Sequence, residues 1–251
     1  MSSSPAASSS PVAADVPPPR ILLVAAFAAL YVIWGSTYFG IAVAIETIPP
    51  FPMVGIRQLV AGVVLVAILR ARGVAWPDRA HWTGAIVGGV LLLVLGNGLV
   101  AWAEQHIASG VASLVIATTP LSIMTIAALV PGGERPTARA VAGLLLGCAG
   151  LVVLAWPGAM AALRGEAAHG GIDAFGLVVL VFATICWATG TVLGRFLPRH
   201  ANAFMASAQQ MLVAGVVLLV TTMITGDLGR LDLGAISARS WLALGYLIAI
   251  G

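Results

Sequence analysis

The heptapeptide Leu59-Val60-Ala61-Gly62-Val63-Val64-Leu65 recurs letter for letter as Leu212-Val213-Ala214-Gly215-Val216-Val217-Leu218, at an offset of 153 residues. At the same offset Trp34-Gly35-Ser36 falls on Trp187-Ala188-Thr189, so a tryptophan, a small residue and a hydroxyl residue match. Apolar segments drawn from few residue types do match by chance. The agreement of two motifs at one offset nevertheless indicates an internal repeat.

The repeat lies within a series of long apolar segments. Seven of them approach or exceed the roughly 20 residues that a helix needs to cross a bilayer: residues 21–45, 52–69, 82–103, 109–130, 137–156, 174–193 and 203–225. An eighth begins near Ser240 and stops at Gly251 after about half a crossing. Lipid offers the backbone no hydrogen-bond partner, and continuous apolar runs lack the alternation of a barrel strand. The sequence therefore predicts an all-α, polytopic helical membrane protein.

The two copies of the repeat are predicted to cross the membrane in opposite directions. Five segments separate each residue from its counterpart, and an odd number reverses the direction of crossing. Trp82 and Trp241, which open the third segment of each copy, match at an offset of 159 residues. A complete second set would then end near residue 315, about 159 beyond residue 156. We therefore expect a five-plus-five inverted-repeat fold with only about seven and a half helices present.

This interpretation divides the chain into four parts. Residues 1–20, rich in Ser, Ala and Pro, form a disordered cytoplasmic tail, because such a segment buries too little apolar surface to offset its chain entropy. Residues 21–156 form the first repeat, 157–172 an outer loop and 173–251 the incomplete second repeat.

Composition excludes several classes of protein. The chain has 251 residues, of which 60% are apolar and 8% charged, against about 25% charged in an ordinary soluble domain. All 12 basic residues are arginines, scattered in short gaps between apolar runs rather than gathered on one face, so no nucleic-acid partner is expected. Cys148 and Cys186 lie inside apolar runs, where we expect them to behave as small hydrophobic residues. The expected surroundings are a lipid bilayer.

Arginine placement predicts the orientation. Eight arginines fall on the side that holds the N-terminus: Arg20, Arg70, Arg72, Arg79, Arg135, Arg139, Arg195 and Arg199. The other side holds Arg164, Arg230 and Arg239, and Arg57 lies inside the second segment. By the positive-inside rule the N-terminus is predicted to be cytoplasmic.

Three motifs within this pattern resemble those of the drug/metabolite transporter superfamily, EamA type. They are Trp34-Gly35-Ser36-Thr37 in the first segment, and Gly110-Val111-Ala112-Ser113 followed by Thr118-Thr119-Pro120-Leu121 in the fourth. The resemblance covers about residues 21–251. It implies a secondary transporter that exports or exchanges small metabolites, amino acids or drugs across the inner membrane by alternating access, with both termini cytoplasmic. The alternative is a non-transporting membrane subunit or scaffold derived from a truncated transporter.

Trp34 and Trp187 are candidate cavity walls. Both lie too deep in their segments for the interfacial anchoring that usually explains a membrane tryptophan. Beside them, Ser36 and Thr189 stand among small residues that allow close helix approach or a local opening of the backbone. Interhelical packing of the two rings is the alternative to a substrate-binding role.

Asn97 and Glu104 are further candidates in the third segment. Together with Ala101 they are spaced at i, i+4 and i+7 and so share a helix face, and Gly96 and Gly98 flank Asn97. An asparagine in lipid needs a partner or water, so Asn97 either binds substrate or bonds another helix. Glu104, near the outer end of the segment, is a candidate gate or a hydrated helix end.

The fourth segment carries a stripe of hydroxyl groups at Thr118, Ser122 and Thr125. Pro120 lacks an N–H and so frees the carbonyl of Ile116, which we expect to serve a substrate beside Thr118. Alternatively, the hydroxyls bond to their own helix and satisfy the kink.

Arg57 is the one charge well inside a segment. It either snorkels to the outer surface and pairs with Glu46, or recognises an anionic substrate or acts as a gate. Its counterpart at the repeat offset is Gln210, so the charge is not symmetric.

Two glycine pairs, Gly84 with Gly88 and Gly143 with Gly147, allow close helix packing within the chain or in a homodimer. Motifs for hydrolases, zinc sites and phosphate loops are missing from the sequence, so no enzyme activity, metal or cofactor is expected.

Overall fold

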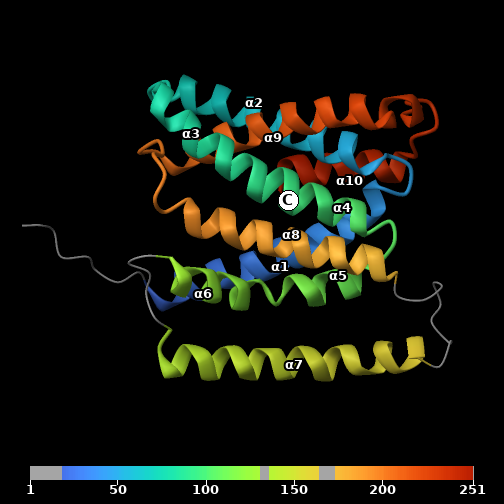
Figure 1. Cartoon of the computed structure of the whole chain (residues 1–251). Helices are drawn as coiled ribbons and strands as arrows, with labels where there is room; N and C mark the ends of the chain where they lie inside the picture. The colour runs from blue at the N-terminus through green and yellow to red at the C-terminus, as the bar shows by residue number, and fades with distance from the viewer. Residues whose placement is uncertain (1–18, 131–135, 164–172, 251) are drawn as a thin grey trace, which may run out of the picture.

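A computed structural model describes residues 19–130, 136–163 and 173–250, and the regular elements in these ranges are all helical (Figure 1). They include six helical spans long and apolar enough to cross a membrane, two of which are divided into shorter elements. Some of the predictions fall outside the described residues: those for residues 1–18 of the tail, for residues 164–172 of the loop, and for Arg135 and Arg164. The fold class predicted from the sequence, a polytopic helical membrane protein, is confirmed.

The first four crossings contain seven elements. The first two are α1 (Arg20–Ala44) and α2 (Pro50–Ala71). The third crossing consists of α3 (Arg79–Gly88), the π-helical η1 (Gly89–Gly98) and α4 (Leu99–Ala103). The fourth is divided at Ala117–Thr118 into α5 (Ser109–Ile116) and α6 (Thr119–Leu129), because Pro120 cannot donate a backbone hydrogen bond.

The remaining elements are α7 (Ala138–Leu163), α8 (Ala174–Leu193), α9 (Ala203–Thr225), the short η2 (Asp227–Arg230) and α10 (Ala238–Ala249). The bounds of α8 and α9 are those expected from the apolar runs. α7 continues to Leu163 rather than ending at residue 156, so the beginning of the predicted outer loop is helical.

Each helix of the second repeat begins at a residue that satisfies its free N–H groups. The side chains of Asp173, Asn202 and Ser237 accept hydrogen bonds from Phe175 N, Met205 N and Ser240 N in the first turns of α8, α9 and α10. α9 ends at Gly226, whose φ of 77° is a left-handed conformation that glycine adopts without strain.

The two copies of the heptapeptide pack directly against each other where α2 crosses α9. A β-carbon at Gly215 would lie 2.7 Å from the backbone nitrogen of Leu59, and one at Gly62 would lie 3.1 Å from the backbone nitrogen of Leu212. Gly62 and Gly215 are repeat counterparts, as are Leu59 and Leu212. Reciprocal contact of this kind is what a two-fold axis through the crossing requires.

The other contacts between the repeats follow the same symmetry. α1 packs against α10, and its counterpart α8 packs against η1 and α3, which contain the counterpart of α10 at residues 79–90. At the far side, meaning the side where α1 ends, Ser240 Oγ donates to Val43 O (3.0 Å) and Ser237 N to Thr47 Oγ1 (3.2 Å). At the N-terminal side, where α1 begins, the rings of His81 and His200 lie 5.4 Å apart.

These contacts fix the direction of each helix. The start of α10 lies beside the end of α1, whereas the start of α3 lies beside the end of α8, where Gly84 faces Pro198 O. α1 therefore runs from the N-terminal side to the far side, and α8 runs back, as Figure 1 also shows. The loops 72–78 and 226–237 accordingly lie at opposite ends, as an inverted repeat requires.

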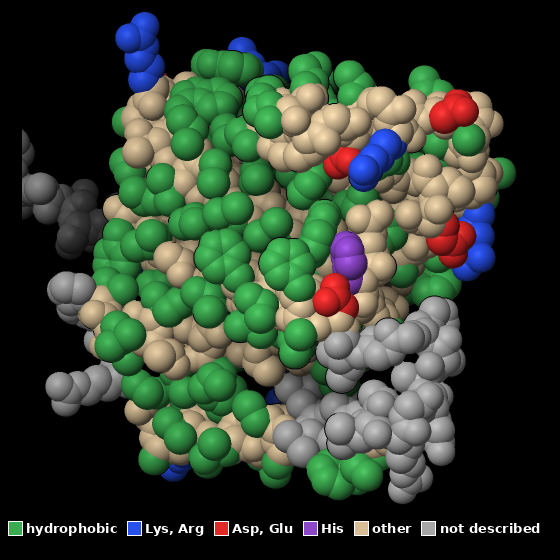
Figure 2. All heavy atoms as spheres, turned by 45° about the vertical axis from the view of Figure 1, so that its right-hand side comes forward, with side chains coloured by type: hydrophobic (Ala, Val, Ile, Leu, Met, Phe, Trp, Pro, Cys, Tyr) green, Lys and Arg blue, Asp and Glu red, His purple; other side chains and the backbone are tan. Residues whose placement is uncertain are grey.

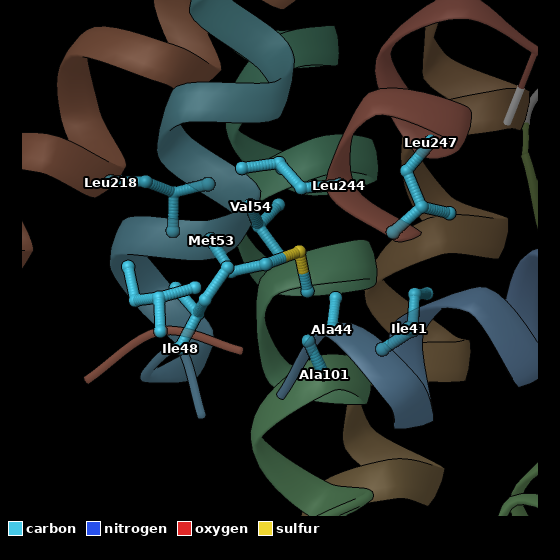
Figure 3. Packing of buried hydrophobic residues seen from close by; sticks show 10 residues of the cluster. Ile41, Ala44, Ile48, Met53, Val54, Ala101, Leu218, Leu244 and Leu247 are labelled. Carbon is cyan, nitrogen blue, oxygen red and sulfur yellow. The ribbon is translucent and has the colours of Figure 1, made fainter. Parts of the chain in front are cut away.

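The main apolar core lies on the far side of the crossing. It includes Ile41, Met53, Ala101, Leu218 and Leu247, contributed by α1, α2, α4, α9 and α10, and Figure 3 shows their side chains pointing into one cluster. Because lipid is as apolar as these side chains, close packing rather than burial from water stabilises such a cluster.

The exterior is also apolar. Figure 2 shows a face covered mostly by hydrophobic side chains, with the acidic groups gathered toward one end. Gly84 and Gly88 pack inside the chain, against Pro198 and Gln210, whereas Gly143 and Gly147 of α7 have open space around them.

The α2–α9 crossing predicts a large effect for one methyl group. Gly215→Ala would place a β-carbon 2.7 Å from Leu59, so the helices must separate. We expect a loss of about 1–3 kcal/mol, which lowers Tm by about 2–4 °C per kcal/mol in a chain of this size. Thermal unfolding of the purified protein in detergent measures it. Gly245→Ala, in open space on α10, is the control and should leave Tm unchanged; equal Tm values for the two variants would contradict the close crossing.

Candidate functional site

A cavity of about 310 Å³ lies among the helices on one side of the α2–α9 pair. Its walls come from α1, α2, η1, α4, α5, α6 and α8, so both repeats contribute. Most of its lining is apolar and includes Leu30, Ile33, Ile41, Leu93, Val100 and Ala183. α10 supplies none of the lining residues, and α2 contributes Arg57.

Trp34 of α1 and Trp187 of α8 form one continuous aromatic wall of the cavity. Their ring centroids lie 6.0 Å apart with the planes tilted by 41°, a common geometry for an aromatic pair. A solute cannot enter between rings this close, so the pair offers one surface. The Trp187 ring lies against Gly96, where a β-carbon would come within 2.7 Å of Cδ1.

Tyr38 extends this wall, and the sequence analysis missed it. Trp34 Nε1 donates to the Tyr38 hydroxyl oxygen at 3.0 Å, one helical turn away along α1. The hydroxyl hydrogen of Tyr38 has no acceptor among the described residues. The i, i+4 spacing of Trp34 and Tyr38 was the signal that could have found it.

Arg57 reaches the cavity from α2 and does not pair with Glu46. The residue is 6% exposed, and its Nη1 atom forms no hydrogen bond with any residue that the structure describes. Glu46 instead pairs with Arg239 at 3.5 Å. The expected interfacial pair is therefore wrong, because α10 brings a nearer arginine to the end of α1.

Asn97 lines the cavity from η1, next to Gly96. Gly96, Asn97 and Gly98 lie in a π-helical segment, a form that is frequent at functional sites. Ala101, expected on the same face, is fully buried in the apolar core, and Val100 follows Asn97 along the cavity instead.

Glu104 lies just beyond α4, toward the far side, and does not line the cavity. Both carboxylate oxygens are buried without a hydrogen-bond partner in the described part of the chain. The interpretation as a hydrated helix end therefore does not hold for its carboxylate.

Four residues expected at the site lie outside the cavity lining. Thr118 Oγ1 donates to Val115 O at 2.6 Å, and the Ile116 carbonyl freed by Pro120 accepts from the hydroxyl of Thr119. The Thr118 hydroxyl hydrogen and the Ile116 carbonyl are thus hydrogen-bonded within the kinked helix, and Pro120 itself is exposed. The other two residues outside the lining are Ser36 and Thr189. Ser36 bonds to its own helix and to the Tyr246 hydroxyl, and Thr189 Oγ1 donates to Ile185 O at 2.8 Å.

Three threonines line the cavity that the sequence analysis did not select: Thr37, Thr119 and Thr184. Each donates its hydroxyl hydrogen to a backbone carbonyl of its own span. A hydroxyl bound in this way retains only its acceptor capacity.

Comparison with known proteins gives consistent matches. A model of the EamA-like transporter family matches residues 21–156. The inner membrane transporter YedA of Escherichia coli K12 is 37% identical over 231 residues, covering 91% of this chain and 70% of YedA. The transporter YvbV of Bacillus subtilis is 26% identical over 239 residues, 94% of this chain and 74% of YvbV.

A chloroplastic WAT1-related protein of Arabidopsis thaliana is 26% identical over 195 residues, which cover 77% of this chain and 46% of that protein. No solved structure matches the chain.

The cavity predicts a difference in water access between two neighbouring positions. In a background with Cys148 and Cys186 replaced by alanine, Asn97→Cys should react with a small water-soluble methanethiosulfonate. Ala101→Cys, in the same crossing but 0% exposed, should remain unlabelled. Mass spectrometry of the intact protein measures the modification. Equal labelling of the two cysteines would contradict the cavity.

Proposed function

Because the chain belongs to the EamA-like transporter family, we propose that it is a secondary transporter that exports or exchanges a small organic solute across the inner membrane by alternating access. The chain is a multi-pass membrane protein related to an inner membrane transporter. Metabolites, amino acids and drugs are the solute classes proposed, and the N-terminus is proposed to be cytoplasmic.

The observation that carries this proposal is the aromatic wall of the cavity. Trp34 and Trp187 are counterparts in the two repeats, and their rings are in contact inside the cavity. Transporters built from inverted repeats bind solute near the midplane, at the interface between repeats. Residues of both repeats line the cavity, and its 310 Å³ is near the lower end of the range for small-molecule sites.

The packing also provides a pivot for the proposed motion. The close α2–α9 crossing lies at the centre, while the repeats touch near both membrane surfaces, at His81 and His200 on one side and at Thr47 and Ser237 on the other. Rocking about the crossing would open one of these peripheral contacts at a time, which is the movement alternating access requires. Glu104, buried near the far side, is proposed as a gate.

Loss of either tryptophan should impair transport. Trp34→Ala and Trp187→Ala each remove half of the aromatic wall, and we expect about a ten-fold or greater loss of solute flux, in line with the energetic weight of a large aromatic contact. Flux into proteoliposomes, screened over amino acids, nucleobases and organic ions, measures it. Trp156→Ala on α7, where the side chain is 61% exposed and remote from the cavity, is the matched control. Unchanged flux in the Trp34 and Trp187 variants would remove both residues from the site.

A disulfide across the far-side contact should stop solute transport. Ser237 N lies 3.2 Å from Thr47 Oγ1, a separation that brings the two backbones within disulfide range. We expect a Thr47→Cys, Ser237→Cys double variant, lacking the native cysteines, to lose flux on oxidation and recover it on reduction. Each single variant controls for the substitution. Full flux with the disulfide formed would contradict movement at this contact.

A further inference from the structure

We infer that the cavity binds an organic anion, a carboxylate or phosphate attached to an apolar body, and that Arg57 holds the anionic group. This inference rests on the proposed transport function and names the class of solute. It is carried by the burial of Arg57, by the absence of an ion-pair partner for Arg57 among the described residues, and by the further free donors in the cavity.

Arg57 is too deep to be an interfacial residue. On α2 the contacts of the α2–α9 crossing are at Leu59 and Gly62. Arg57 lies three to four residues from the point midway between them, which is about 5 Å along the helix axis. The hydrocarbon core extends about 15 Å to either side of its midplane. The residue is 6% exposed and lines the cavity, so its side chain does not snorkel along the lipid surface.

The positive charge of Arg57 has no counter-ion in the described part of the chain. Glu46 pairs with Arg239, and Asp227 pairs with Arg230. The buried carboxylate of Glu104 has no hydrogen-bond partner and so is not bound to Arg57. An isolated buried charge is costly, and in membrane proteins such residues commonly mark a substrate path. A bound anion would supply the missing partner.

The cavity offers further free donors. The hydroxyl hydrogen of Tyr38, the indole N–H of Trp187 and the amide of Asn97 form no hydrogen bond with any described residue. The lining threonines, by contrast, donate their hydroxyl hydrogens to backbone carbonyls and retain only acceptor capacity. A carboxylate or phosphate accepts several hydrogen bonds and can bind the planar fork of an arginine through two of them.

The rest of the solute should be apolar. Apart from Arg57, Asn97, Tyr38 and the three threonines, the walls are the tryptophan pair, Gly96 and aliphatic side chains such as Leu93 and Val100. A volume of about 310 Å³ fits a body of one ring or a short chain rather than an extended polar molecule.

Calorimetric titration of the whole purified chain in a neutral detergent tests this inference. The probes are 3-phenylpropanoate, octanoate and phenyl phosphate, each compared with 3-phenylpropanamide and 3-phenylpropylamine. We expect at least one anion to bind about ten-fold or more tightly than the amide, the range of a charge-assisted hydrogen bond, and the amine to bind least. Dihexanoyl phosphatidylglycerol is titrated in parallel, and tighter binding of this lipid than of the soluble anions assigns the anionic group to a lipid headgroup. No anion preference in any of these titrations would overturn the inference.

Variants assign the preference to Arg57. Arg57→Gln should abolish the preference of the anion over the amide while leaving Tm unchanged or higher, because it removes an unpaired buried charge. Arg57→Lys, which keeps the charge but loses the fork, should retain part of it. Arg70→Gln, the same change at the exposed end of α2, should retain all of it. A preference that survives in Arg57→Gln, or that disappears only with a lowered Tm, would overturn the assignment.

Flux in proteoliposomes separates this inference from the proposed function. Anion preference that depends on Arg57, without flux of any bound anion, would refute transport and leave the anion site standing. Flux of the amide or amine without anion preference would refute the anion site and leave transport standing.

Discussion

The structure depends on one close approach, the crossing of α2 and α9 at Gly62 and Gly215. In lipid there is no gain from hiding apolar side chains, so two helices associate through packing and backbone proximity. Glycine at both crossing positions lets each helix backbone reach a leucine of the other, with Leu59 and Leu212 in reciprocal places. Once this contact is fixed, α1 must meet α10 where α8 meets η1, and the cavity must lie between the repeats.

The fold was predictable because the bilayer leaves few alternatives. Each long apolar run must be a helix, and the repeated heptapeptide supplied both the symmetry and the inverted direction. The sequence did not predict the π-helical segment η1 or the length of α7. A π-helix depends on packing around the helix, here of Gly96 against the Trp187 ring, rather than on a residue motif of its own.

The candidate site was only partly predictable, and the reason is local hydrogen bonding. Trp34, Asn97 and Trp187 do not bond to a backbone carbonyl of their own helix, and all three line the cavity. Hydroxyl groups are different, because a serine or threonine bonds readily to a carbonyl three or four residues earlier. Thr118 and Thr189 do this and lie outside the cavity, whereas Thr119 and Thr184 do it while lining the cavity. Residue type alone cannot separate these cases.

The symmetry of the fold is not shared by its charge, and this difference bears on specificity. Arg57 and Gln210 occupy equivalent positions, yet Gln210 packs against Gly88 of α3 while Arg57 enters the cavity. A two-fold frame by itself would present the same surface to a solute from both sides. A single buried cation breaks that equivalence and gives the cavity one polar end and one aromatic wall. In the proposed transporter, a solute with an anionic head and an apolar body would match this arrangement in only one orientation. The repeats would then supply the movement, and Arg57 would fix the orientation in which the solute binds.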